Sequence, residues 1–250
     1  MSNLSSPTTV GTSGSDPAAS TSAKSNLMVR LAVRLSVGVV VAAAILFLPA
    51  GTWEFWQGWA YLAVTVIPVA GVYLYFLKVD PEVVERRMEG REQVGEQKRL
   101  IRWSGPAFIA TFLLPGFDQR LGWSAKLWGA EPLALTLLSQ TAVLAGIFTV
   151  AWVMAVNRFA ARTIRVEAGQ KVISTGPYAI VRHPMYAGCV LLWVFTPLAL
   201  GSYVSLPAFI LLVPFYAIRL LNEEKVLCVE LPGYADYCLH TRYRLIPLVW

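Results

Sequence analysis

The sequence predicts an all-α fold: a polytopic bundle of about six transmembrane helices, with a cytoplasmic C-terminal segment folded against it. Two features of the composition support this prediction. Hydrophobic residues make up 56% of the 250 residues and charged residues only 14%, with a mean hydropathy of +0.55. A water-soluble protein normally carries about a quarter charged residues, so this chain lacks the charge to be solvated on all sides. The third observation is the order of the apolar segments along the chain.

The chain is expected to have three parts. Residues 1–26 are rich in Ser, Thr, Gly and Ala without apolar periodicity, which predicts a disordered tail. Residues 27–156 contain most of the apolar runs and should form a transmembrane scaffold. Residues 157–250 hold the polar motifs described below. The first apolar run has no convincing cleavage site after it, so we interpret it as a retained helix.

Each expected span is an apolar segment that should form a helix, because a helix satisfies its own backbone hydrogen bonds in lipid. The first is ended by Pro49 and Gly51, and aromatic residues flank the second as an interfacial belt would. The third is short and contains Pro106 and Pro115, so it either crosses at a thin point or only dips into the bilayer. Gly201 and Ser202 join the last two into a helical hairpin. The six segments are Leu31–Leu48, Trp56–Leu77, Trp103–Phe117, Pro132–Val156, Tyr186–Leu200 and Leu206–Leu221.

The basic residues predict the orientation in a multi-pass inner or plasma membrane. With six crossings and both termini in the cytoplasm, all but two of the 21 Lys and Arg residues lie on the inner side. The outer loops hold only Arg120 and Lys126. This asymmetry is what the positive-inside rule demands, and it argues against nucleic acid as the partner of the +6 net charge. Within the inner loop 78–102, Asp80 and Pro81 should begin a short surface helix, either a solvated face or a lid over a cytoplasmic site.

Several kinds of site are excluded by what the sequence lacks. The three cysteines have neither zinc-ligand nor disulfide-framework spacing, and the two histidines are far apart, so no metal site is expected. Glycine-rich nucleotide loops and serine nucleophile elbows are also missing. The chemistry must therefore come from other residues.

The segment from Gly176 to Tyr186 is the first candidate site. Pro184 fits the first position of a helix, and His183 before it is pushed to extended geometry at the helix mouth. Free N–H groups of that first turn, with Arg182 alongside, would attract an anion. Tyr178 and Tyr186 offer aromatic faces to an adenine ring or a cation. On composition alone, a ligand site and an interfacial membrane anchor are both open.

Arg219 and Glu223 form the second candidate site, because residues four apart share one helix face. Arg before Glu is the weaker order for an intrahelical pair, and carboxylates near a helix C-terminus oppose its dipole. This favours a binding role over helix stabilisation, while snorkelling of Arg219 to the membrane surface is the alternative. The aromatic tail after Leu231 should fold back beneath the bundle as an amphipathic segment, with His240 in interfacial packing.

Four sequence blocks together resemble the isoprenylcysteine carboxyl methyltransferase family of integral-membrane enzymes, and its bacterial branch most. They are Gly176-Pro-Tyr-x-x-x-Arg-His-Pro-x-Tyr186, Arg219-x-x-x-Glu223-Glu224, Pro232-Gly-Tyr-x-x-Tyr237 and Tyr243-Arg-x-Ile-Pro247. The resemblance covers about residues 157–250, and the first 156 residues match only as helical spans. Met185 departs from the family pattern, because a small residue often stands there.

The resemblance implies S-adenosylmethionine as cofactor, held at the cytoplasmic ends of the last spans. Glu223 would take its amino group, and Arg219 would bind the acceptor as a catalytic residue together with Glu223. The implied cofactor-binding residues are Gln170, Lys171, Val172, Ile173, Tyr178, Arg182, His183, Pro184, Met185, Tyr186, Glu223 and Glu224. The implied acceptor is a lipophilic, isoprenoid-like or lipid-linked carboxylate within the membrane lipids.

Three other functions stay open on the sequence. Phospholipid or other amine N-methylation is a rival within the same class. A sterol-type membrane reductase that uses NADPH has a similar Arg-His-Pro-x-Tyr block, but typically Asn after the proline, where this chain has Met185. A non-catalytic membrane subunit with the same fold is the third.

Overall fold

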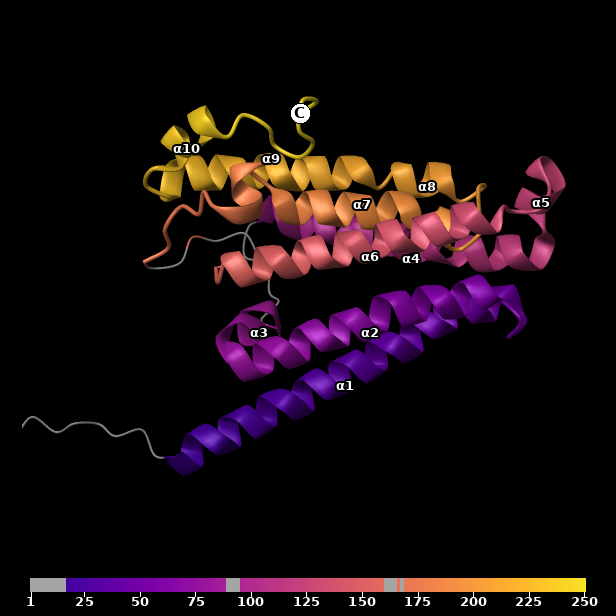
Figure 1. The fold of residues 1–250 in the computed structure, drawn as a ribbon, viewed down its shortest axis with the longest axis horizontal. Coiled ribbons are helices and arrows are strands. Elements are labelled where there is room, and N and C mark those ends of the chain that lie inside the picture. Colours follow the sequence, from indigo (N-terminus) through magenta and orange to yellow (C-terminus); the bar gives the residue numbers. More distant parts are fainter. Residues whose placement is uncertain (1–16, 89–94, 160–165, 167–168) are drawn as a thin grey trace, which may run out of the picture.

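The computed structural model describes residues 17–88, 95–159, 166 and 169–250, and across these residues the chain is helical with no strand. Figure 1 shows the helices lying side by side along one direction, with the C-terminal segment at one edge of the bundle. The elements are α1 (Pro17–Ala50), α2 (Trp56–Val79), α3 (Pro81–Met88), α4 (Gly95–Leu121), α5 (Trp123–Trp128), α6 (Leu133–Val156), the 3-10 helix η1 (Gly176–Ala179), α7 (Pro184–Ala199), α8 (Leu206–Ile210), α9 (Val213–Glu230) and α10 (Tyr234–His240). The all-α membrane bundle is confirmed.

The first helix begins earlier than the sequence predicted. α1 starts at Pro17, so residues 17–26 are helical rather than disordered, and the rest of the expected tail lies outside the described residues. A proline at the first helical position and three alanines soon after favour helix, and the apolar span behind them extends it. The end of α1 is as expected, with Gly51 in the left-handed region at φ 65°.

The third expected span was wrong in its bounds. Instead of Trp103–Phe117, the structure forms α4 over Gly95–Leu121, with Pro106 and Pro115 inside the helix. Its 27 residues reach about 40 Å, more than the roughly 30 Å hydrocarbon core. Membrane helices tolerate proline because neighbouring helices and polar groups take over the freed backbone bonds.

Four helices in the described part of the chain are long and apolar enough to cross a membrane: Ser25–Ala50, Trp56–Val79, Leu133–Val156 and Leu206–Glu230. α7 is apolar but has only 16 residues. The chain is therefore an integral membrane protein, while the number of six crossings and the cytoplasmic termini stay predictions.

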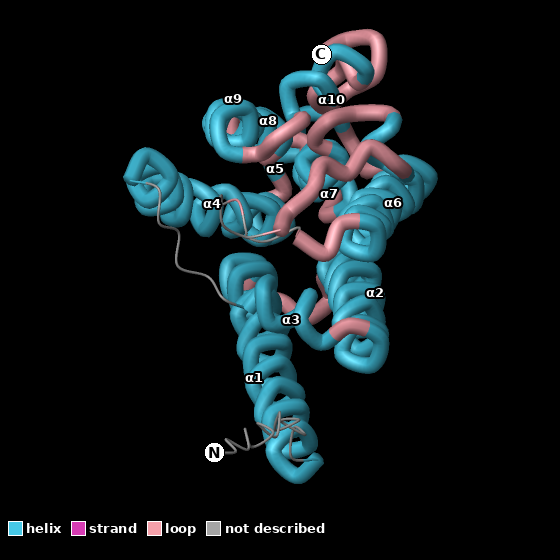
Figure 2. The backbone as a smooth tube through the Cα atoms, turned by 90° about the vertical axis from the view of Figure 1, so that its left-hand side faces the viewer, coloured by secondary structure: helices cyan, strands magenta, loops and turns pink. Residues whose placement is uncertain are grey.

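α6 and α7 form the most extensive contact between two described helices, and Figure 2 shows them as neighbours. Their contact is made by two glycines. A Cβ added at Gly146 would lie 2.7 Å from the Gly188 carbonyl oxygen, and one added at Gly188 would lie 2.9 Å from the Gly146 oxygen. Small residues let membrane helices approach this closely, and here they bring the backbones of α6 and α7 together.

Replacing Gly146 with alanine is expected to destabilise the protein by about 1–3 kcal/mol, because the backbone of α7 must move away. Gly71→Ala in α2 is the matched control, since nothing lies within 4 Å of its added Cβ. Alanine there should be neutral or stabilising by about 0.5–1 kcal/mol. Thermal unfolding in detergent measures both, and equal melting temperatures would contradict the proposed close contact.

The turn between α7 and α8 confirms the predicted hairpin. Gly201 adopts φ 72°, and the Ser202 hydroxyl donates to Asp118 Oδ2 at 2.5 Å. Asp118 is only 3% exposed and also accepts from the Ser124 backbone N–H at 2.8 Å. These bonds tie the hairpin to the end of α4, opposite the end that carries the candidate site.

The last span differs from the prediction in a way that matters for the site. It breaks between α8 and α9 and then continues as helix to Glu230 rather than ending at Leu221. Arg219, Glu223 and Glu224 therefore lie inside α9, about two to three turns before its end. We expected these carboxylates to lie at a helix C-terminus and to oppose its dipole, and this expectation was wrong. Their placement depends on tertiary contacts instead.

Candidate functional site

The Gly176–Tyr186 segment opens with the predicted turn, which forms η1. Gly176 has φ 60°, and Pro177 is buried behind it. The Tyr178 hydroxyl accepts a hydrogen bond from Asn157 Nδ2 at 2.8 Å, and its carbonyl accepts one from the Tyr237 hydroxyl at 2.7 Å. Burial raises the pKa of Tyr178 to about 12, so its hydroxyl stays protonated at neutral pH.

The start of α7 is built as the sequence predicted. Pro184 occupies the first position of the helix, and His183 before it has φ −126°. The backbone N–H groups of Arg182 and His183 donate to the carbonyls of Tyr243 and Arg244, each at 2.9 Å. This confirms that the C-terminal tail folds back, since it pairs with the segment that leads into α7.

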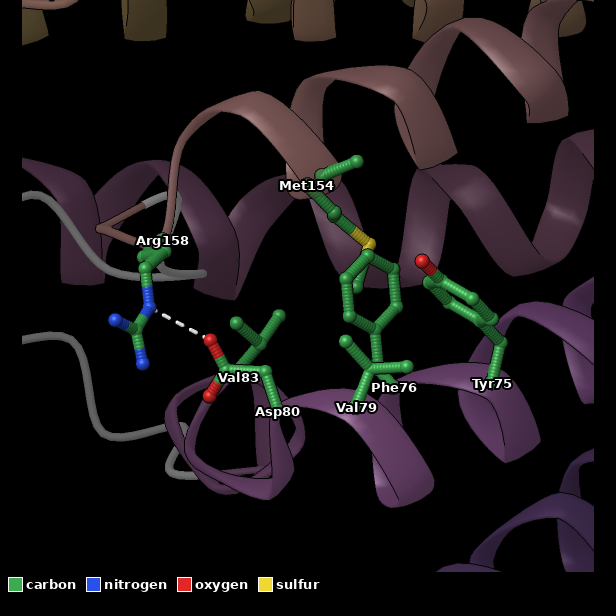
Figure 3. A pocket seen from close by; sticks show the side chains of 8 residues that line it. Tyr75, Phe76, Val79, Asp80, Val83, Met154 and Arg158 are labelled. Atoms are coloured by element: carbon green, nitrogen blue, oxygen red, sulfur yellow. Dashed lines mark ion pairs between the residues drawn. The ribbon is translucent and has the colours of Figure 1, made fainter.

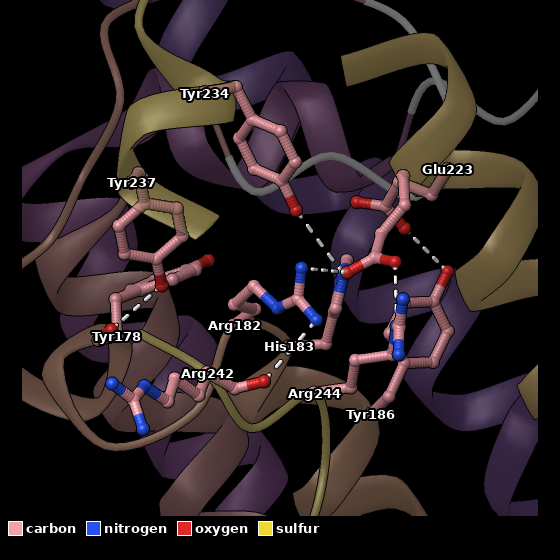
Figure 4. A network of polar contacts seen from close by, with 10 residues as sticks. Tyr178, Arg182, His183, Tyr186, Glu223, Tyr234, Tyr237, Arg242 and Arg244 are labelled. Carbon is pink, nitrogen blue, oxygen red and sulfur yellow. Dashed lines mark hydrogen bonds and ion pairs between the residues drawn. The ribbon is translucent and has the colours of Figure 1, made fainter. Parts of the chain in front are cut away.

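Glu224 is the centre of a charged network between α9, this segment and the tail. Figure 4 shows its partners Arg182, His183 and Arg244. One carboxylate oxygen lies 3.1 Å from Arg182 Nη1 and 3.3 Å from His183 Nε2, and the other accepts from Arg244 Nε at 2.7 Å. The side chains of Glu224, Arg182 and His183 are exposed by only 10%, 9% and 4%. The Tyr234 hydroxyl lies 3.4 Å from His183 Nε2 on the other side. Glu224 therefore fixes the positions of Arg182, His183 and Arg244 relative to one another.

Glu223 faces a different set of partners. The Tyr186 hydroxyl donates to Glu223 Oε2 at 2.7 Å, and Arg219 is close enough to Tyr186 to interact with its hydroxyl. Glu223 and Arg219 are both half-buried on the same face of α9, as their spacing predicted. The structure thus brings the two candidate sites of the sequence together around Tyr186.

The remaining predicted residues lie at the rim of this site. Val172 packs with Tyr178 against the tail cluster of Leu231, Tyr234 and Tyr237. Gln170 and Ile173 are half-buried and Lys171 is exposed. The sulfur of Met185 lies 3.4 Å from Arg87 Nη2, so a residue of α3 also reaches the start of α7.

Sequence reasoning missed three residues that help to build the site. Arg87 stands in the part of the chain where no motif was found, and Asn157 stands at the first position of the expected 157–250 part, outside its motifs. Arg244 stands in the Tyr243-Arg-x-Ile-Pro247 block but had been given no role. Of these three residues, Arg244 alone had a signal, because it lies within one of the four blocks that carry the family resemblance.

One cavity borders the site, and a second lies apart from it. One of about 550 Å³ lies on the opposite face of α9, where Glu224 and Arg244 line it together with Ile218, Leu221, Asn222, Lys225 and Cys228. The other, of about 300 Å³, lies between α2, α3 and the end of α6, with Phe76, Val83 and Met154 in its wall (Figure 3). Arg158 Nε and Asp80 Oδ2, 2.6 Å apart, close one side of it. Among the residues described, no group of His, Cys, Asp or Glu is arranged to bind a metal ion.

Residues 134–230 match the family model described as phospholipid methyltransferase. This region belongs to that family of membrane methyltransferases. The match spans α6 to α9 and includes the Gly176–Tyr186 segment, Arg219, Glu223 and Glu224, so it covers the walls of the site. No curated protein matches the chain.

Membership of the phospholipid methyltransferase family favours a methyltransferase over the reductase that the Arg-His-Pro-x-Tyr block had left open. The match begins in α6, before the motifs that suggested residue 157 as a boundary, and ends before the tail. The isoprenylcysteine carboxyl branch, the cofactor and the acceptor stay predictions.

Proposed function

We propose that the protein transfers a methyl group from S-adenosylmethionine to the carboxylate of a lipophilic acceptor at the cytoplasmic face of the membrane. The observation that supports this most is the arrangement on α9, where Glu223 is held by Tyr186 and Arg219 lies beside the same hydroxyl. One face of one helix thereby offers an anion and a cation to two ligands.

The residues present fit the cofactor. S-adenosylmethionine, when bound, supplies an electrophilic methyl group on a sulfonium. The half-buried Glu223 carboxylate would pair with its ammonium group, and the Tyr186 hydroxyl aims that carboxylate. Tyr178 and Met185 would enclose it, with the 170–173 strip contributing backbone groups at the rim. Glu224 acts through the residues it holds, since both its oxygens bind basic side chains.

Carboxylate methylation needs little acid–base chemistry. A carboxylic acid is already ionised at neutral pH, so the chain has to place it and offset its charge rather than remove a proton. Arg219 would do both, because a guanidinium pairs with a carboxylate through two parallel hydrogen bonds. An in-line approach to the methyl group would follow from the common position of Arg219 and Glu223 on α9.

The second candidate function is N-methylation of a phospholipid amine, which the name of the matching family favours. An amine is protonated at neutral pH and must lose that proton before it can attack. A guanidinium beside the acceptor opposes the binding of such a cation. We therefore rank the carboxylate first.

Replacing Arg219 with alanine tests the proposal. The purified protein would be given S-adenosylmethionine labelled in the methyl group, with N-acetyl-S-farnesylcysteine or phosphatidylethanolamine as probe acceptor. Label in a methyl ester is released by alkali as methanol, whereas an N-methyl group is stable. We expect alkali-labile label, and an acceptor KM raised about tenfold or more in Arg219→Ala, with S-adenosylhomocysteine binding little changed.

Lys225→Ala is the matched control, because it removes an exposed cation from the opposite face of α9. It should leave the acceptor KM within about twofold. Alkali-stable label in phosphatidylethanolamine would select the second candidate function. Equal loss of cofactor binding and acceptor use in Arg219→Ala would refute the role given to Arg219.

A further inference from the structure

α3 is a firmly packed part of the bundle rather than a loose surface helix or lid. Val83, Val84 and Met88 are 2%, 0% and 4% exposed and pack against α1, α2 and Met154 of α6. The Met88 carbonyl accepts a hydrogen bond from Arg34 Nη1 at 2.7 Å, which caps the end of α3. Side chains on α3 therefore have fixed directions relative to α6 and α7.

The two arginines of α3 point to different places. Arg86 lies 3.4 Å from Glu82, donates to the Arg158 carbonyl at 2.9 Å and stacks over the Phe159 ring. Arg87, turned by about 100° on the helix, instead reaches the sulfur of Met185 at 3.4 Å. Arg87 therefore connects α3 to the first turn of α7.

Arg87 shares its surroundings with the residues of the candidate site. Two charges act on the half-buried Tyr178: Glu223 raises its pKa and Arg87 lowers it, both less than burial does. Arg87 also interacts electrostatically with Cys189, one turn beyond Met185. A positive charge from α3 and a negative charge from α9 thus both act on Tyr178.

We propose that Arg87 is a carboxylate-binding residue of the methyl-transfer site, supplied by the N-terminal half that the family match does not cover. The half-buried guanidinium, fixed by α3 and close to Tyr178 and Met185, has the planar fork that pairs with a carboxylate. Two carboxylates would come within its reach: that of the amino-acid part of the cofactor, and that of the acceptor. The inference rests on the proposed function.

Calorimetry with two cofactor fragments separates these sources. S-adenosylhomocysteine has the carboxylate and 5′-methylthioadenosine lacks it. If Arg87 binds the cofactor carboxylate, Arg87→Ala weakens S-adenosylhomocysteine about tenfold or more and leaves 5′-methylthioadenosine unchanged. If it binds the acceptor, both affinities persist and the KM for N-acetyl-S-farnesylcysteine rises about tenfold.

Arg86→Ala is the matched control and should change none of these values by more than about twofold, because Arg86 points away from the site. Arg87→Lys keeps the charge without the fork, and we expect it to recover part of the lost affinity. It also serves if Arg87→Ala fails to fold. Equal weakening of both cofactor fragments, or no change in affinity or KM, would overturn the inference.

The proposed function can fail independently of this inference. One outcome is a wild-type protein that binds S-adenosylhomocysteine and methylates the probe while Arg87→Ala does both equally well. That outcome refutes the role of Arg87 and leaves the proposed function standing. A wild-type protein that does neither defeats both proposals.

Discussion

Replacing Glu224 with alanine is expected to release the C-terminal tail and to destabilise the protein by about 3–5 kcal/mol. The carboxylate holds Arg182, His183 and Arg244, which come from three places in the chain. Removing it leaves the nearly buried Arg182 guanidinium without its 3.1 Å ion-pair partner. Breaking a buried pair by deleting one member costs far more than the pair contributes, because a desolvated charge is left behind.

Thermal unfolding in detergent and limited proteolysis after residue 230 would measure this effect. Glu230→Ala is the matched control, since it removes an exposed carboxylate from the end of the same helix. It should change stability by no more than about 0.5 kcal/mol. Glu224→Gln keeps the shape and one acceptor oxygen but replaces the other oxygen with an NH2 donor, so its stability should lie between those of Glu224→Ala and Glu230→Ala. A tail in Glu224→Ala as resistant to protease as in wild type would contradict the role of Glu224.

Most of the fold could be predicted because membrane helices obey local rules. Apolar length fixed α2 and α6 to within a few residues, and the proline at position 184 marked the beginning of α7. Gly201 marked the hairpin turn, where its φ of 72° suits glycine. These features depend on a few neighbouring residues and on the bilayer, and both can be read from one sequence.

The errors arose where polar residues continue a helix. Apolarity alone ended the last span at Leu221, yet α9 continues to Glu230 because its polar residues are good helix formers and find partners in the tail. Residues that favour helix also extend α4 back to Gly95 and α1 back to Pro17. Hydropathy predicts which part of a helix lies in lipid, but it does not predict where the helix ends outside the membrane.

The sequence named many of the residues that meet in the structure, but it did not predict the contacts between them. The spacing of Arg219 and Glu223 placed them on one face, and the structure agrees. The contacts of Glu224 with Arg182 and Arg244 join residues about 40 and 20 positions apart, and no local pattern predicts them. Arg87 was further from prediction still, since its contact with Met185 crosses 98 positions of sequence.

Replacing Glu223 with glutamine is expected to weaken the binding of S-adenosylhomocysteine by about 10- to 100-fold while leaving the fold intact. Glutamine can still accept the hydrogen bond that the Tyr186 hydroxyl gives at 2.7 Å, so the local geometry persists. What disappears is the negative charge that would pair with the ammonium group of the cofactor. A charge-assisted hydrogen bond in a half-buried site contributes about 1.5–3 kcal/mol, which corresponds to this loss of affinity.

Two further measurements make the assignment of Glu223 specific. 5′-Methylthioadenosine has no ammonium group, so Glu223→Gln should bind it as the wild type does. Tyr186→Phe keeps the aromatic wall and removes only the hydroxyl that aims the carboxylate, and we expect it to weaken S-adenosylhomocysteine by about 3- to 10-fold. If Glu223→Gln binds S-adenosylhomocysteine as tightly as wild type, Glu223 does not hold the ammonium group. If it loses 5′-methylthioadenosine equally, Glu223 shapes the site as a whole, because the loss then follows the adenine-bearing part that both ligands share.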